Sequence, residues 1–390
     1  MSKSAVALLA AIALGAGACG SDGGSSGGTT AASPAVTATP TAAATVALSL
    51  TETGCDPATL TAPAGAVTFN VDNARDAKAE FEILSATPKI LTEEFLEPGA
   101  SGSFTVDLVA GDYQVICGRP SDTRAALTVT GEGGGQQALT VDSAALDAAT
   151  AAYATYVNQQ VDQLVSGTTE FVTAVKGGDV AAAKALYAPV RRPWERIEPV
   201  AELFPDSDGA IDSRVDDFSG PDDPEFTGFH RIEKGLWEDG STNGLDTVAD
   251  RLDTDVQALA TNVRSLQITP DVMVNGAAGL IEEAAQTKIT GEEERYSHTD
   301  LDTFAANVDG AKVIYDNISP LLKGVDPTLD DEIASRFTAI AGLLQPYQQG
   351  DAFVSYDQLD DADRNQLKAA LAALSEDLSQ VAGAFGLEVK

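Results

Sequence analysis

Two side chains suited to metal or acid-base chemistry stand three residues apart near the middle of the chain. The segment Phe226–Trp237 contains His230, one of only two histidines in the sequence, and Glu233. On a helix, this spacing places the imidazole and the carboxylate on one face. An apolar stripe from Phe229 to Leu236 runs beside them, which predicts a core-facing helix. Two buried polar groups need partners, and either a metal ion or an ordinary hydrogen-bond network can supply them.

Three glutamates lie upstream on one face of a helix that we expect to begin at Pro193. They are Glu195, Glu198 and Glu202. Like charges at spacings of three and four residues destabilise a helix, so something should compensate for them. Arg191, Arg192 and a bound cation are the candidates.

An acidic connection, Asp206–Phe218, joins this helix to the histidine segment. It differs from a calcium-binding EF-hand loop because its glycine is at the fourth position and the closing glutamate is missing. We interpret it as a link that brings Asp212 or Asp216 towards His230.

The second histidine, His298, stands two residues before Asp300 in an acidic segment that begins at Gly291. Three interpretations remain open. His298 and Asp300 are a second set of metal ligands, a hydrogen-bonded pair near a helix N-terminus, or a gate over the first site.

Known hydrolase patterns fit these residues poorly. A zinc peptidase helix carries two histidines one turn apart, and that pattern does not occur in the sequence. A serine hydrolase carries a Gly-x-Ser-x-Gly elbow between a strand and a helix, and no such elbow is visible in the part of the sequence that predicts strands and helices. One imidazole among several carboxylates is a hard ligand set that suits iron or manganese. Helix bundles build such sites from inward-facing Glu and His side chains.

The composition narrows the class of partner. The chain has 390 residues, of which 44% are hydrophobic and 21% are charged, and its formal net charge is −35. This content is typical of a folded protein that is long enough for two domains. The negative charge argues against binding to nucleic acid or to an anionic membrane surface, and it attracts cations.

The N-terminus has the pattern of an export signal. Lys3 precedes an apolar run, Ala5–Leu14, and small residues lead to Cys19. The run is too short to span a membrane. We expect residues 1–19 to be a lipoprotein signal peptide with lipidation at Cys19, which places the protein outside the cytoplasm on a membrane anchor. Cleavage near Ala18 without lipidation is the alternative.

The remainder divides by composition and periodicity. Residues 20–45 are rich in Gly, Ser, Thr, Ala and Pro and predict a disordered tether. Residues 46–131 show short alternating runs between turns, typical of a small β-sandwich. A linker at 132–140 leads to residues 141–390, where the period becomes that of helices. We therefore expect an all-β domain followed by an all-α bundle, with separate helices starting at Asp179 and Pro193.

The β-domain contains two cysteines, Cys55 and Cys117. If Cys19 carries lipid, these two remain, and in an oxidising compartment they most simply form a disulfide. Their use as a pair of metal ligands is the alternative.

Several motifs in order resemble the EfeO family of extracytoplasmic iron-binding proteins, which combine a cupredoxin-like domain with an imelysin-like helical domain. The motifs are Cys55-Asp-Pro57, Tyr113-Gln-Val-Ile-Cys117-Gly118, Trp194-Glu-Arg-Ile-Glu-Pro199, Ile211-Asp-Ser-Arg-Val-Asp-Asp-Phe218, Gly228-Phe-His-Arg-Ile-Glu233 and Ile289-Thr-Gly-Glu-Glu-Glu-Arg-Tyr-Ser-His-Thr-Asp300. The likeness covers essentially all of the chain after the signal.

The resemblance implies an iron site in the helical domain, with iron as Fe²⁺ or Fe³⁺. The ligands that it implies are His230, Glu233, Glu198, Asp216 and Glu202. It also implies a second site, for copper or iron, in the cupredoxin-like domain. That site would use Cys55, Cys117, Glu82 and Glu94. The domain contains no histidine, whereas a blue-copper centre needs two, so electron transfer through such a centre is not expected.

The resemblance also implies two partners, a membrane permease that receives the iron and a secreted haem peroxidase. We therefore expect a non-enzymatic iron-uptake lipoprotein. A metallopeptidase of the imelysin type, with Glu233 as the general base, and a metal-free surface scaffold are the alternatives.

Overall fold

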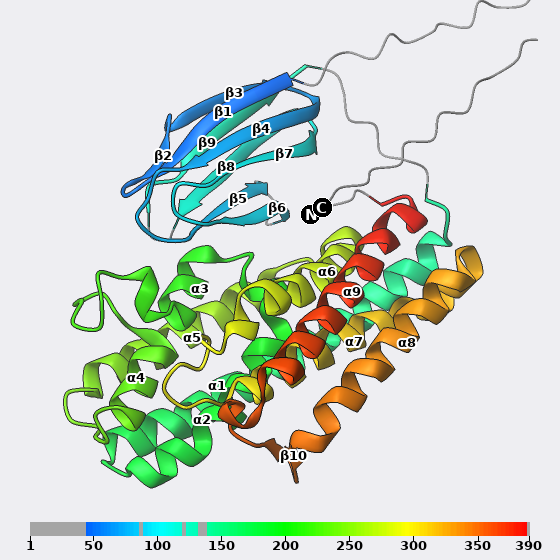
Figure 1. The fold of residues 1–390 in the computed structure, drawn as a ribbon. Helices are drawn as coiled ribbons and strands as arrows, with labels where there is room; N and C mark the ends of the chain where they lie inside the picture. Colours follow the sequence, from blue (N-terminus) through cyan, green and yellow to red (C-terminus); the bar gives the residue numbers. More distant parts are fainter. Residues whose placement is uncertain (1–43, 86–88, 119–121, 132–138, 388–390) are drawn as a thin grey trace, which may run out of the picture. The chain divides into compact units, whose positions relative to one another are not determined.

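The computed structural model describes residues 44–85, 89–118, 122–131 and 139–387 (Figure 1). The expected signal peptide with Cys19, most of the expected tether and most of the expected linker lie outside these residues. No helix in the described ranges is long and apolar enough to cross a membrane.

Residues 44–130 form a β-sandwich of two sheets. One sheet has the strand order β2-β1-β4-β7 and the other has the order β3-β9-β8-β5-β6. The strands are β1 (Ala44–Thr51), β2 (Gly54–Asp56), β3 (Thr59–Pro63), β4 (Gly65–Asn73), β5 (Ala79–Ser85), β6 (Ile90–Leu96), β7 (Ser101–Leu108), β8 (Gly111–Gly118) and β9 (Ala125–Thr130).

The sandwich follows the alternation of its sequence. In β4, Val67, Phe69 and Val71 are fully buried, and the intervening residues are more exposed. Because successive side chains of a strand point to opposite faces, this alternation turns one face of the sheet into the core. The predicted all-β N-terminal domain is confirmed.

Residues from Ser143 onwards form the helical domain (Figure 1). Its helices are α1 (Ser143–Lys176), α2 (Val180–Ala201), α3 (Pro205–Asp212), α4 (Gly228–Trp237), α5 (Asp246–Ser265), α6 (Pro270–Gln286), α7 (Asp300–Val325), α8 (Pro327–Leu344) and α9 (Asp361–Phe385). Four short 3₁₀ turns occur between them, η1 (Val215–Asp217), η2 (Lys288–Thr290), η3 (Gln345–Tyr347) and η4 (Tyr356–Gln358). Two strands of two residues each, β10 (Gln348–Gln349) and β11 (Ala352–Phe353), are the departure from an all-helical domain.

The helices bury the faces that their spacing predicts. In α1, Tyr153, Val157, Val161 and Phe171 are all buried. Asp326 caps α8 by accepting hydrogen bonds from the backbone N–H groups of Thr328 and Leu329. The predicted all-α C-terminal domain is confirmed.

One boundary in the helical domain differs from expectation. A new helix was predicted to begin at Pro193, but α2 runs without a break from Val180 to Ala201 and contains Pro189, Pro193 and Pro199. A proline inside a helix removes one backbone hydrogen bond. The fully buried side chains of Trp194 and Ile197 keep the helix packed against its neighbours despite this loss.

Candidate metal centre

Helix α4 holds His230 in the interior. Phe229, Ile232 and Leu236 are fully buried, and His230 and Glu233 are 2% and 0% exposed. Gly228 starts the helix with a φ of 78°, and a Cβ atom there would lie 2.2 Å from the backbone oxygen of Ile211. This close approach, which only glycine allows, brings the end of α3 and its Asp212 beside the start of α4.

Glu233 fixes the orientation of the imidazole. One carboxylate oxygen, Oε2, lies 3.2 Å from His230 Nδ1. The other, Oε1, accepts hydrogen bonds from the backbone N–H groups of Tyr296 at 3.0 Å and Ser297 at 2.7 Å. Because a carboxylate only accepts hydrogen bonds, this geometry places a ring proton on Nδ1.

The other ring nitrogen, Nε2, faces two further carboxylates. His230 Nε2 is buried and has no hydrogen-bond partner. It lies 3.4 Å from Asp212 Oδ1 and 4.0 Å from Glu293 Oε1. The three residues each offer a ligand atom within 4.8 Å of the others. A ring nitrogen and two carboxylate oxygens that face one another in the interior are a ligand set suited to a cation, and the guanidinium of Arg191 also contacts both oxygens.

Neighbouring groups hold these two carboxylates in place. The indole N–H of Trp194 donates to Asp212 Oδ2 at 2.8 Å. Arg214 Nη1 donates to Glu293 Oε2 at 2.9 Å. Burial acts to raise the pKa of Glu293, but Lys288, Arg214 and other cations outweigh it and lower the pKa to about 2. Glu293 is therefore a carboxylate at neutral pH.

Two buried cations balance part of this negative charge. Arg191, 1% exposed, donates to Glu294 at 2.9 Å and to Glu195 at 2.6 Å, and it also contacts Asp212. Lys288 contacts Glu195 and Glu198. Burial alone lowers the pKa of Lys288, but the surrounding carboxylates raise it well above its usual value. Arg191 thus compensates Glu195, as the sequence suggested, while Arg192 pairs with Asp302 instead.

Glu198 and Glu202 are not part of the group around His230. Together with Glu283 they form a separate group, in which each residue offers a carboxylate oxygen within 4.8 Å of the others. Glu198 accepts a hydrogen bond from Asn307 at 2.8 Å. Burial and the charge of Glu283 raise the pKa of Glu198 well above its usual value. The helix face predicted from the sequence therefore has two surroundings. Glu198 and Glu202 meet Glu283, whereas Glu195 pairs with Arg191, and Lys288 lies between Glu195 and Glu198.

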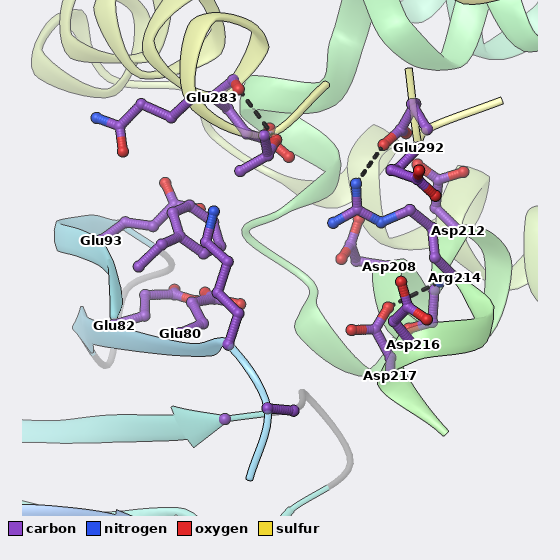
Figure 2. Close-up of a pocket in the computed structure, with 18 of the residues that line it drawn as sticks. Glu80, Glu82, Glu93, Asp208, Asp212, Arg214, Asp216, Asp217, Glu283 and Glu292 are labelled. Carbon is purple, nitrogen blue, oxygen red and sulfur yellow. Dashed lines mark hydrogen bonds and ion pairs between the residues drawn. The ribbon is translucent and has the colours of Figure 1, made fainter. Parts of the chain in front are cut away.

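Asp216 lies apart from both groups. Its carboxylate pairs with Arg295, and its side chain is 69% exposed. Of the two aspartates proposed to approach His230, Asp212 is the one that the structure brings there. Figure 2 shows Asp208, Asp212, Asp216 and Asp217 around Arg214, and these residues help to line an open pocket beside the buried histidine.

His298 and Asp300 do not form a pair with each other. His298 Nδ1 lies 3.6 Å from Asp357 Oδ1, and its backbone has a φ of 57°. Asp300 Oδ1 instead accepts a hydrogen bond from the backbone N–H of Glu294 at 3.2 Å. Asp300 thus helps to fix the turn that carries Glu293 and Glu294.

In the β-domain, Cys55 and Cys117 form a disulfide with an S–S distance of 2.05 Å. This is the first of the two alternatives that the sequence left open. Metal ligation requires thiolates, and a disulfide offers none. Both cysteines belong to the apolar core of the sandwich.

The glutamates predicted to join them lie on different faces of the sheet. Cys117 and Glu94 are both paired in register with Phe81, whereas Glu82 follows Phe81 and points to the opposite face. The residue opposite Glu82 is Glu93 (Figure 2). Burial, followed by the charges of Glu82 and Glu93, raises the pKa of Glu80 well above its usual value. The face of the sheet that carries Glu82 therefore also carries Glu80 and Glu93, and the two cysteines lie elsewhere, in the apolar core.

Comparisons with known proteins agree with the two-domain architecture. The family model described as imelysin, peptidase M75, matches residues 149–381. The cupredoxin-like domain model matches residues 28–129. The chain is 45% identical over 344 residues to the iron uptake system component EfeO of Yersinia pestis, which is 88% of this chain and 92% of that protein. The chain belongs to the EfeO family.

Other matches extend this result. The chain is 43% identical to the iron uptake system component EfeO of Escherichia coli K12, over the same shares of both chains. A crystal structure of a protein from Parabacteroides distasonis covers 61% of this EfeO family member and 95% of its own chain, with a TM-score of 0.51 and 20% identity. That likeness concerns the fold alone. The relatives' names support a role in iron uptake.

The sequence did not indicate a role for several residues in and around the candidate metal centre. Glu293 and Glu294 stood inside a quoted motif, and the run of three glutamates was their signal. Nothing in the sequence indicated that Lys288 is buried, because a lysine that follows a helix is ordinarily exposed to solvent.

Proposed function

We propose that this EfeO family member captures iron outside the cytoplasm at His230 and delivers it to a membrane permease. The observation that carries this proposal is the buried Nε2 atom of His230, which has no hydrogen-bond partner and faces Asp212 and Glu293. The relatives named as iron uptake system components support iron as the cargo.

In this proposal, His230, Asp212 and Glu293 hold the iron. Glu233 acts as the positioning residue, because a metal-binding histidine commonly donates its other ring N–H to a carboxylate that orients it. Glu198, Glu202 and Asp216, which the family resemblance suggested as ligands, stay outside this set. We place the cargo in the helical domain because the disulfide leaves Cys55 and Cys117 without thiolates.

Delivery rests on partners within the same uptake system. The names of the relatives describe a component of a system, which supports partners within that system. A membrane permease and a haem peroxidase are the partners that the family resemblance implies. Lipid attachment at Cys19 would keep the protein at the membrane where the permease lies. The net charge of −35 attracts cations and raises their local concentration.

The imelysin family model carries a peptidase name, so peptide hydrolysis is the second candidate. Its general base would have to be Glu233. Both oxygens of Glu233 are already engaged, one by His230 and the other by two backbone N–H groups. This arrangement favours an orienting role for Glu233 over proton abstraction from water.

Metal binding by the full chain tests the proposal. Fe²⁺ is dialysed against wild type, His230→Ala and His298→Ala under anaerobic conditions, and the bound iron is measured. We expect bound iron in wild type and in His298→Ala, because His298 lies outside the site, and loss in His230→Ala. Equal, substoichiometric iron in all three proteins would refute iron capture at His230. Casein cleavage that disappears in His230→Ala would instead support the peptidase.

A further inference from the structure

Lys288 is a buried cation that the proposed function does not use. It is 1% exposed and lies in the 3₁₀ turn η2 (Lys288–Thr290) after α6. A lysine ammonium is rarely buried unless it is paired, because its desolvation is costly. Its partners therefore show what its charge does.

The ammonium group lies between two sets of carboxylates. Lys288 Nζ is 3.0 Å from Glu195 Oε2, contacts Glu198 Oε1 and lies 3.8 Å from Glu293 Oε1. Glu293 faces His230 Nε2, and Glu198 belongs to the group with Glu202 and Glu283. The lysine thus carries positive charge to the edge of the proposed iron site.

The backbone of this turn is fixed by Tyr356. The Tyr356 hydroxyl donates to the backbone oxygen of Ile289 at 2.5 Å. Gly291 follows with a φ of 80°, and a Cβ atom there would lie 2.6 Å from the Tyr356 ring. Because the turn is held in this way, the ammonium stays within reach of the carboxylates.

We propose, on the basis of the proposed function, that Lys288 is an internal counter-cation that lowers the affinity of the His230 site for iron and so keeps capture reversible. In the metal-free protein, its charge stabilises the buried carboxylates. When a cation binds at Glu293, the ammonium repels it at short range in a poorly screened interior. A carrier that must pass its cargo onward needs this limit on affinity.

A purely structural role for Lys288 predicts the opposite change in affinity. Removing one partner of a buried ion pair leaves a charge uncompensated and disturbs its surroundings. A disturbed site binds metal more weakly. A counter-cation, once removed, leaves a more negative site that binds metal more tightly.

The test measures anaerobic Fe²⁺ affinity of the full chain by equilibrium dialysis. Lys288→Met is expected to bind Fe²⁺ about tenfold more tightly than wild type, which corresponds to about 1.4 kcal/mol. Lys288→Arg keeps the charge and should restore the wild-type value. Lys234→Met is the matched control, because Lys234 lies on α4 but pairs with Glu238 and Asp239. Unchanged or weaker binding in Lys288→Met would overturn the inference.

A second pair of variants covers the case in which Lys288→Met does not fold. Glu195→Gln is compared with Glu195→Gln/Lys288→Met, in which a cation and one of its carboxylate partners are removed together. The double variant should bind Fe²⁺ about tenfold more tightly than the single variant. Equal affinities would again refute the role of Lys288. If wild type itself binds no iron, the proposed function fails rather than this inference alone.

Discussion

The helical domain and the β-sandwich both bury carboxylates, but the helical domain gathers them around a histidine, and the sandwich contains no histidine. Around His230, carboxylates from α3, α4 and the turn before α7 converge on one imidazole. In the sandwich, Cys117 lies on one face of β8, and Glu82 of the adjacent strand points to the other face. Helical spacing gathers residues three apart, whereas strand spacing separates neighbours.

The two regions also differ in how they are stabilised. The helical site keeps its charges and balances them with Arg191 and Lys288. The sandwich closes its two cysteines into a covalent bond. This difference predicts that changes in the helical domain affect metal binding and changes in the sandwich affect stability.

The largest expected effect is the loss of a proposed ligand. Asp212→Asn should weaken Fe²⁺ binding more than about 100-fold, because removal of an orienting partner alone typically costs 10–100-fold. Glu82→Gln in the sandwich should leave the affinity unchanged. Anaerobic equilibrium dialysis of both variants measures the contrast. An equal loss in the two variants would break the distinction between the regions.

Removal of the disulfide should have the opposite pattern of effects, with a loss of stability and no change in iron affinity. Replacement of both Cys55 and Cys117 by alanine should destabilise the sandwich by about 2–5 kcal/mol, since a cross-link restricts the unfolded chain. The affinity for Fe²⁺ should not change. Urea unfolding followed by a β-domain signal measures the first effect, and dialysis measures the second. A loss of iron affinity in the double variant would place the cysteines in the metal site after all.

The helical site should also respond to pH through Asp300. Burial raises the pKa of Asp300 to about 8, so the folded protein holds this proton more tightly than the unfolded chain. The contribution to stability is complete below about pH 4 and is lost as pH rises through about 8, and it amounts to a few kcal/mol.

Asp300→Asn mimics the protonated acid and tests this effect. We expect the variant to lose less stability than wild type between pH 5 and pH 8 in urea unfolding. Parallel losses in the two proteins would show that Asp300 ionises normally in the folded state.

The smallest effect is expected for the orienting residue. Glu233→Gln keeps the size of the side chain but weakens its hold on His230 Nδ1, so Fe²⁺ affinity should fall about 10–100-fold. This loss should be smaller than that of Asp212→Asn. A larger loss would identify Glu233 as a direct ligand instead of a positioning residue.

The sequence predicted the parts of this structure that depend on local spacing. His230 and Glu233 meet because three residues separate them on a helix, and the sandwich core follows the alternation in β4. For the aspartate that approaches His230, the sequence left two alternatives, Asp212 and Asp216, because the sequence of an acidic loop does not reveal which side chain points inward.

The remaining residues depend on packing between distant segments. Arg191 and Glu294 are 103 positions apart and meet only because α2 packs beside the turn before α7. Glu198 shares its predicted helix face with Glu195, yet Glu283 from α6 draws it into another group. In the sandwich, the strand register decides that Glu93, and not Glu94, is opposite Glu82. None of these partnerships is encoded by local spacing.

The most direct measurement is an anomalous-scattering crystal structure of the full chain soaked with iron. We expect one strong iron peak bonded to His230 Nε2, with Asp212 and Glu293 as further ligands and Glu233 still hydrogen-bonded to Nδ1. Iron bound between Glu198, Glu202 and Glu283, or in the β-sandwich, with His230 Nε2 left unbound, would contradict the central claim.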